Sequence, residues 1–122
     1  MRLLDSNLFI YASKGQFRSH IMPLLASTDT YASEFTKLEA LGFPLLNPIE
    51  KAFLENAFSG IVLIGIDSAI ILKAIEPRQQ RKMSAGDAIH AATALLHNLE
   101  LNTRNEADFN WINGLKVVNP IP

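Results

Sequence analysis

The chain has 122 residues, 48% hydrophobic and 19% charged, a composition typical of a globular domain and not of a disordered chain. The length predicts one domain spanning residues 1–122, and the absence of cysteine excludes disulfide scaffolds, thiolate zinc sites and thiol nucleophiles. Eleven basic and twelve acidic residues give a net charge of −1, which is not the balance of a strongly basic nucleic-acid binder.

The N-terminal apolar residues do not have the pattern of a signal peptide. Asp5 and Asn7 interrupt the run, and no small-residue cleavage pattern follows it. No stretch elsewhere reaches the roughly 18–20 apolar residues that cross a bilayer. We therefore expect a cytoplasmic protein without a membrane partner.

Short β-like runs alternate with helical runs along the chain. Strands are predicted over residues 2–5, 30–32, 61–66, 99–103 and 115–118. Residues 61–66 form an unbroken apolar run, which is typical of a buried parallel strand. This alternation predicts an α/β fold with a central parallel sheet and helices on both of its faces.

The helices are bounded by residues that favour or stop helical structure. Helices are predicted over residues 6–13, from the cap Ser33 to Gly42, and over 48–59, 67–75, 84–98 and 108–112. Pro23 limits any helix in residues 14–29 to a short one, and the helix 67–75 is expected to stop before Pro77.

Four acidic residues are placed by this topology near one edge of the sheet. Ligands of open parallel sheets bind outside the carboxyl ends of the strands. Asp5 ends the first strand, Asp108 follows the strand 99–103, and Asp87 lies in the first turn of its helix. Glu39 lies inside a helix and leans toward that helix's N-terminus. We expect these four carboxylates to converge in one cleft.

Such a cluster has the chemistry of a site for a hard divalent cation. Neighbouring carboxylates repel one another, and they remain ionised together when a cation shares them. Mg²⁺ or Mn²⁺ prefers oxygen ligands and can activate water against a phosphodiester. Asp5, Asp87 and Asp108 are the expected direct ligands, with Glu39 completing the cleft directly or through water. The flanking polar residues expected to orient them are Ser6, Asn7, Thr103 and Asn105.

Each acid also has a purely structural interpretation. Asp5 can cap the following helix, Ser84 with Asp87 resembles a capping box, and Asp108 can cap the turn 108–112. Glu39 alone would be an ordinary solvated helix residue. Only the combination favours a catalytic site.

Two further features have open interpretations. His90 lies one turn after Asp87, where a supporting or packing role is favoured over that of a general base. Residues 73–82 carry a net charge of +3, which can bind RNA phosphates or simply solvate a helix end.

Four segments, in order, resemble the PIN-domain nucleases of the VapC-type toxin group. They are LLDSNLFIYA at residues 3–12, SEFTKLEALGF at 33–43, GDAIHAATAL at 86–95, and LNTRNEADF with GLKVVNP at 101–109 and 114–120. The helix motif DAIHAATAL with TRN-x-x-DF behind it is the most specific part. The resemblance implies a PIN-like three-layer fold and a metal-dependent endoribonuclease whose acidic quartet is Asp5, Glu39, Asp87 and Asp108.

The same resemblance implies the partners of the site. Thr103 and Asn105 match the polar positions beside the fourth acid, and Arg104 fits the TRN pattern. The family implies Mg²⁺ or Mn²⁺, an RNA substrate, a homodimer and a cognate antitoxin of a type II toxin-antitoxin system. Residues 13–30 depart from the family because they contain no long amphipathic helix.

Other functions remain open alternatives. A PIN nuclease can process RNA without an antitoxin, and a PIN-like module can bind RNA or protein without cleaving. A receiver domain is disfavoured because Asp5 stands alone in its segment, and a haloacid-dehalogenase-like phosphatase because Asp5-Ser6-Asn7 lacks a second acid. Without the four proposed site acids the net charge becomes +3, so the near-neutral total does not exclude RNA.

Overall fold

A parallel sheet of five short strands forms the centre of the molecule. The computed structural model describes residues 1–122. The strands are β1 (Arg2–Leu4), β2 (Thr30–Ser33), β3 (Val62–Ile64), β4 (Glu100–Asn102) and β5 (Val117–Val118). Their order across the sheet is β3-β2-β1-β4-β5, and every neighbouring pair is parallel. The predicted parallel α/β architecture is therefore confirmed.

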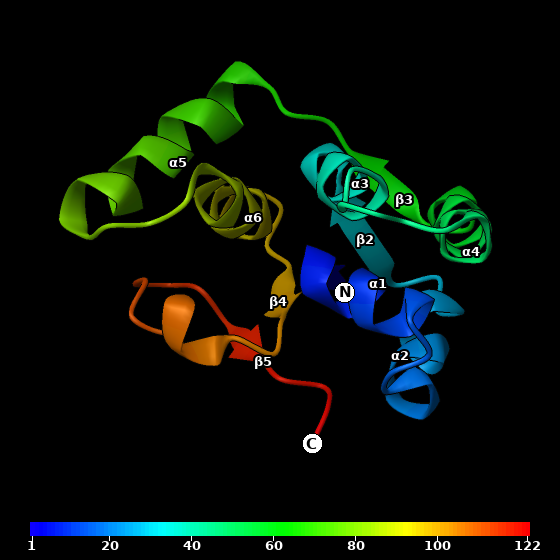
Figure 1. Cartoon of the computed structure of the whole chain (residues 1–122). Helices are drawn as coiled ribbons and strands as arrows, with labels where there is room; N and C mark the ends of the chain where they lie inside the picture. Colours follow the sequence, from blue (N-terminus) through cyan, green and yellow to red (C-terminus); the bar gives the residue numbers. More distant parts are fainter.

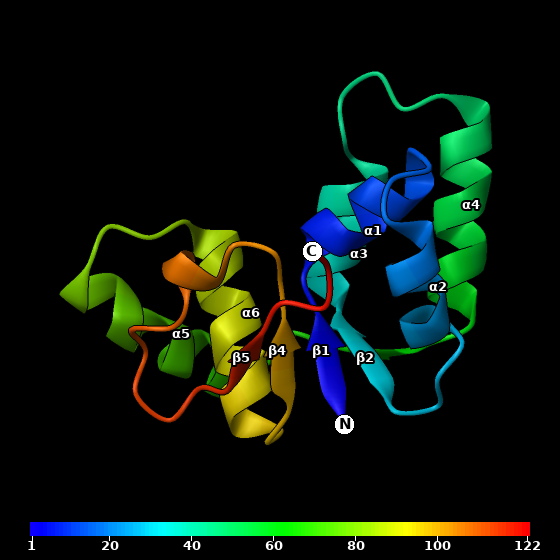
Figure 2. The same ribbon diagram turned by 90° about the horizontal axis from the view of Figure 1, so that it is seen from below.

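Six α-helices flank the sheet in two groups. They are α1 (Ser6–Ser13), α2 (Arg18–Leu25), α3 (Glu34–Leu41), α4 (Pro48–Ser59), α5 (Ser68–Gln80) and α6 (Ala85–Leu96), and a 3₁₀ turn, η1, spans Glu106–Asp108. Helices α5 and α6 lie together on one side and α1–α4 on the other, with the strands between the two groups (Figures 1 and 2). The two groups meet where α3 contacts α6. No helix combines the length and the apolar character that crossing a bilayer would require.

The sheet has a separate apolar core on each face because successive side chains of a strand point to opposite sides. Leu4 packs with Phe9, whose ring stacks on Phe58 with centroids 4.6 Å apart. Leu3 packs on the other face with Leu101 and Phe109. Both leucines are fully buried. The central strand β1 is thus covered on both sides, which fixes the residue that follows it.

The apolar run 61–66 is not the buried strand that its composition predicts. Only Val62–Ile64 is a strand, and it lies at the edge of the sheet, where it pairs with β2 alone. The side chain of Val62 is 54% exposed. An edge strand has one neighbour and incomplete cover, and an apolar sequence does not reveal which strand will occupy that place.

The predicted stop before Pro77 is also wrong, because α5 continues through this residue to Gln80. The buried residues of α5 are Ile70, Ala74 and Pro77, which form one stripe at helical spacing. Ile70 and Ala74 share an apolar cluster with residues of α6. Packing along this stripe outweighs the hydrogen bond that proline removes.

Candidate active site

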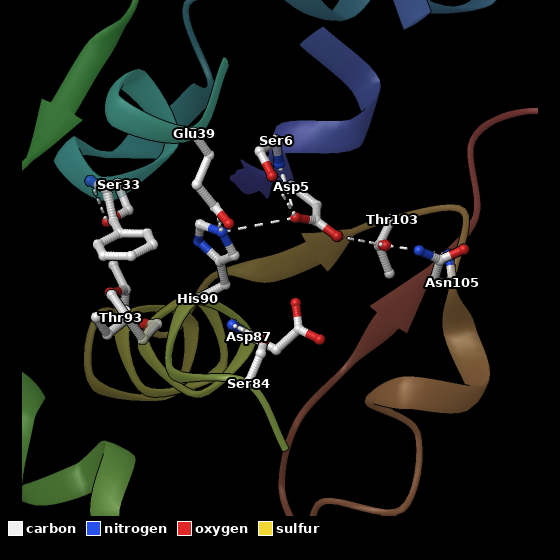
Figure 3. Close-up of polar contacts among 12 residues, drawn as sticks. Asp5, Ser6, Ser33, Glu39, Ser84, Asp87, His90, Thr93, Thr103 and Asn105 are labelled. Carbon is white, nitrogen blue, oxygen red and sulfur yellow. Dashed lines mark hydrogen bonds and ion pairs between the residues drawn. The ribbon is translucent and has the colours of Figure 1, made fainter. Parts of the chain in front are cut away.

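The register of the sheet brings the end of β1 beside the end of β4. Leu4 pairs with Asn102, so Asp5 and Thr103 leave the sheet side by side. The Thr103 hydroxyl donates to Asp5 Oδ2 at 2.8 Å, and the backbone N–H of Asn105 donates to Thr103 Oγ1 at 3.1 Å (Figure 3). Both Asp5 and Thr103 are buried. Thr103 therefore fixes one oxygen of a buried carboxylate.

The other oxygen of Asp5 caps α1. The Ser6 backbone N–H and hydroxyl donate to Asp5 Oδ1 at 2.7 and 3.3 Å. Asp5 is the N-cap of α1, as its structural interpretation predicts. Oδ1 therefore caps the helix, while Oδ2 accepts the hydrogen bond of Thr103. Ser6 thus hydrogen-bonds directly to Asp5.

A buried histidine connects Glu39 with Asp5. His90 Nε2 donates to Glu39 Oε1 at 2.7 Å and lies 3.6 Å from Asp5 Oδ1 (Figure 3). Its side chain is fully buried. Burial disfavours the imidazolium, but the Glu39 hydrogen bond and the charges of Asp5, Glu39 and Asp87 outweigh it, so the pKa of His90 is raised. His90 thus contacts two of the four acids, a position from which it can support them.

The carboxylate of Glu39 is held in its ionised form. Partial burial raises its pKa, but the hydrogen bond and charge of His90 and the Ser6 hydroxyl lower it more, so the net pKa lies below the ordinary value. Glu39 also needs the space beside Gly86, because a Cβ there would lie only 2.8 Å from Glu39 Oε2. Gly86 therefore allows the close approach of Glu39 to the start of α6.

Asp87 lies at the start of α6 with its carboxylate pointing toward the region where Asp5 and Thr103 meet (Figure 3). The helix is capped by Ser84, whose hydroxyl accepts the Asp87 backbone N–H at 3.1 Å. Burial, followed by the charge of Asp5, raises the pKa of Asp87, and Asp108 adds to the rise. Asp87 is thus within electrostatic reach of two other acids.

Asp108 is exposed and ends the turn η1. It is not the cap of a helix over residues 108–112, because the turn precedes it and its backbone oxygen accepts the Trp111 indole N–H at 2.9 Å. Asp87 and Asp108 line one hollow of about 220 Å³, which we call the α5–α6 hollow. Its other lining residues include Arg81, Lys82, Ser84 and Trp111.

The remaining predicted residues lie close to the cluster in sequence but make other contacts. Asn7 Oδ1 is buried without a hydrogen-bond partner. The Arg104 guanidinium lies over the rings of Tyr11 and Phe17, 5.4 and 4.9 Å from their centroids. Asn105 contributes its backbone N–H to Thr103. Asn105 is thus the one of these three that hydrogen-bonds to the group around Asp5.

The donor set fits a hard divalent cation, although no three acidic or histidine side chains are already arranged as a metal site. Asp5 has both oxygens hydrogen-bonded, and Glu39 is paired with His90. Burial and then the charges of Asp5 and Asp108 raise the pKa of Asp87. A cation shared by these carboxylates would relieve the repulsion among them. Carboxylate oxygens are the ligands preferred by Mg²⁺ and Mn²⁺.

Two features of this region are not visible in the motifs. The long-range pairing of His90 with Glu39 spans 51 residues, and its only sequence signal is the position of His90 one turn after Asp87. The Arg81 guanidinium lies over the Trp111 ring, 4.6 Å from its centroid. No sequence pattern signals this second contact, because the two residues come from separate loops.

Comparison with known proteins gives a consistent result. The sequence model of the family described as PIN domain matches residues 2–113. A chain of a toxin-antitoxin complex from Klebsiella pneumoniae is 31% identical, with a TM-score of 0.80 and 98% of each chain covered. A chain of FitAcB from Neisseria gonorrhoeae is 28% identical, with a TM-score of 0.74 and 98% of each chain covered.

The fold recurs in more distant structures. A chain of VapBC2 from Rickettsia felis, bound to a DNA fragment from its promoter, is 18% identical with a TM-score of 0.79 over 97% of both chains. No curated protein sequence matched the chain.

Proposed function

The chain belongs to the PIN domain family, and we propose that it is a metal-dependent endoribonuclease acting as the toxin of a toxin-antitoxin pair. One observation carries the proposal. Carboxylates from four separate segments, Asp5, Glu39, Asp87 and Asp108, are linked by His90 or by mutual electrostatic effects at one edge of a parallel sheet. Acidic side chains gathered at one edge in this way can hold a divalent cation, which supports phosphodiester hydrolysis as the reaction.

Mg²⁺ or Mn²⁺ is the proposed cofactor, with Asp5, Asp87 and Asp108 as its ligands. When bound, the cation activates water and stabilises negative charge on the phosphodiester. Thr103 and Ser6 hold Asp5 in one orientation through hydrogen bonds of 2.8 and 2.7 Å. His90 balances the charges of Asp5 and Glu39 and holds the Glu39 carboxylate against α6. These contacts organise the acids before substrate arrives, which reduces the reorganisation needed in the reaction.

The proposed partners are RNA, an antitoxin and a second copy of the chain, in the cytoplasm. The solved structures similar to this chain include toxin-antitoxin complexes, which supports an antitoxin. Large apolar side chains are also exposed on or next to α3 and α4: Leu38 is 65%, Leu45 99% and Ile49 80% exposed. Exposed apolar groups of this kind support a protein partner. The proposed catalytic unit is the single domain of residues 1–122.

The test is cleavage of a mixed RNA pool by the purified protein. We expect cleavage with Mg²⁺ or Mn²⁺, none with EDTA, and none by Asp5→Asn, because the amide keeps the cap of α1 but loses the charge. Glu106→Gln is the matched control, since Glu106 is an exposed acid on η1 outside the cluster, and it should cleave normally. Full cleavage by Asp5→Asn would refute the proposal.

Binding of RNA without cleavage by the metal-loaded protein would instead identify a PIN-like binding module. Cleavage that no co-expressed neighbouring protein inhibits would favour an RNA-processing nuclease over a toxin. The same purified protein therefore distinguishes the two alternatives. It is assayed for RNA cleavage first alone and then together with the protein encoded by a small gene next to its own gene.

A further inference from the structure

The basic residues of the stretch 73–82, at the end of α5 and in the loop that follows it, do not all have the same role. Lys73 pairs with Glu76 at 3.4 Å, and Arg78 Nε donates to the Met83 backbone oxygen at 3.0 Å, which holds the loop. Arg81 and Lys82 form no ion pair with any acidic side chain, and both line the α5–α6 hollow. Two cationic groups are therefore free to bind an anion beside the acidic cluster.

Arg81 is held in place by an aromatic ring. Its guanidinium lies 4.6 Å from the centroid of the Trp111 ring, and Trp111 Nε1 donates to the backbone oxygen of Asp108 at 2.9 Å. Trp111 also packs against the apolar core that contains Leu101 and Phe109. A guanidinium stacked on a fixed ring loses little freedom on binding, and its N–H edges can still donate to phosphate oxygens.

The α5–α6 hollow suits a segment of a chain better than a whole small molecule. Its volume of about 220 Å³ lies below the roughly 300–1,000 Å³ typical of small-ligand pockets. It is lined by Asp87 and Asp108 as well as by Arg81 and Lys82. An RNA strand with its scissile phosphate at the acids would continue into the hollow with its next phosphate near the two cations.

We propose that the α5–α6 hollow is a subsite for an RNA phosphate flanking the cleaved one, bound by Arg81 and Lys82, with Trp111 as a positioning residue for Arg81. The proposal rests on the proposed ribonuclease function. It specifies the substrate as single-stranded RNA that extends beyond the cleavage site on the α5–α6 side. RNA is favoured over an acidic protein segment because the hollow is continuous with the acids that would carry out cleavage.

The single tryptophan of the chain reports directly on this subsite. In the presence of Mg²⁺, the Asp5→Asn variant is not expected to cleave, and a short single-stranded RNA should change the emission of its Trp111, because phosphate binding changes the position of Arg81 on the ring. An acidic peptide of equal charge should have a smaller effect. Unchanged emission at saturating RNA, or a larger effect of the peptide than of the RNA, would overturn the proposal.

The salt dependence of RNA binding tests the charge contacts. Arg81→Gln should weaken binding about fivefold and reduce the slope of log affinity against log salt by about 0.7, the value for one phosphate contact on a single strand. Lys51→Gln is the control, since Lys51 is exposed on α4, far from α5 in Figure 1, and it should leave the slope unchanged. Equal slopes for the two variants would overturn the subsite.

Failure of the subsite and failure of the proposed activity give different experimental results. Arg81 is exposed, so Arg81→Gln should retain the fold, which circular dichroism checks. If the metal-loaded protein cleaves RNA but both binding tests fail, the subsite is wrong and the nuclease function stands. If the binding tests succeed and no condition gives cleavage, Arg81 and Lys82 bind an RNA phosphate, but the proposed ribonuclease function is wrong.

Discussion

Two buried threonines allow the hydrogen bond to Asp5 to be tested against a matched control. Thr103 Oγ1 donates to Asp5 Oδ2 at 2.8 Å and accepts the Asn105 N–H, whereas Thr36 Oγ1 is buried without a partner. Both side chains are fully buried. Replacing each by valine removes the same hydroxyl with almost no change in shape, so the two variants differ mainly in the hydrogen bonds that are lost.

The expected effects have different magnitudes. A hydrogen bond to a charged group contributes about 1.5–3 kcal/mol, and Asn105 can recover its lost acceptor from water because it is exposed. Thr103→Val should therefore reduce the free energy of unfolding by about 2 kcal/mol. Thr36→Val should leave it unchanged or raise it by up to about 1 kcal/mol, because a buried hydroxyl without a partner is costly.

Urea unfolding in EDTA measures both values. With a slope of roughly 1.5–2 kcal/mol per molar urea, the Thr103→Val midpoint should fall by about 1 M while the slope is unchanged. RNA cleavage should fall for Thr103→Val and not for Thr36→Val. Equal midpoints for the two variants would refute the assignment of Thr103 as the support of Asp5.

The remaining predictions concern the α6 side of the site. Gly86→Ala should lower RNA cleavage, because the new Cβ would lie 2.8 Å from Glu39 Oε2 and would displace this side chain. Gly65→Ala is the control, since its Cβ would meet nothing within 4 Å, and it should not lower cleavage. Equal activity of the two variants would contradict the role of Gly86. Without metal, Asp87→Asn should unfold at an unchanged or higher urea concentration, because burial and then Asp5 raise the pKa of Asp87; a much lower midpoint would show a mainly structural role. Because the pKa of His90 is raised, its protonated imidazole stabilises the fold fully below about pH 6.5, and the metal-free protein should lose this stability as the pH rises above that value. In urea unfolding at several pH values, His90→Asn should lose less stability over the same pH range.

Local signals in the sequence were sufficient for most element boundaries. Ser33 and Ser84 cap α3 and α6 as their positions predict, and Asn47 with Glu50 forms a capping box at the start of α4. These interactions involve residues at most three apart, so a single sequence contains all of the information they need. The parallel sheet follows in turn from the alternation of such elements with short apolar runs.

The misplaced elements depend on tertiary packing. A proline inside a helical sequence usually ends the helix. Pro77 does not end α5, because it belongs to the stripe that is buried together with Ile70 and Ala74. The apolar residues 61–66 predict a buried strand, but only the order of strands across the sheet determines that β3 lies at its edge. Both errors arise because propensity is local and burial is not.

The candidate site shows the same division. The rule that ligands bind at the carboxyl ends of parallel strands was enough to nominate Asp5 and Asp108. The sequence predicts supporting roles for Thr103 and His90, but it does not indicate that Thr103 would bond to Asp5, 98 residues away, or that His90 would join Glu39 to Asp5. Such partners depend on register and helix rotation, which small changes in packing determine.

The pairing of β1 with β4 also has a consequence for protein synthesis. The first strand can pair early with β2, but its other neighbour, β4, is translated much later, and Thr103, 98 residues after Asp5, completes the hydrogen bonding of Asp5. A nascent chain still short of this point lacks β4, which is one of the two neighbours of β1, and it also lacks Asp108. The ribosome that makes the protein is therefore not exposed to an assembled acidic cluster until almost the whole chain has emerged.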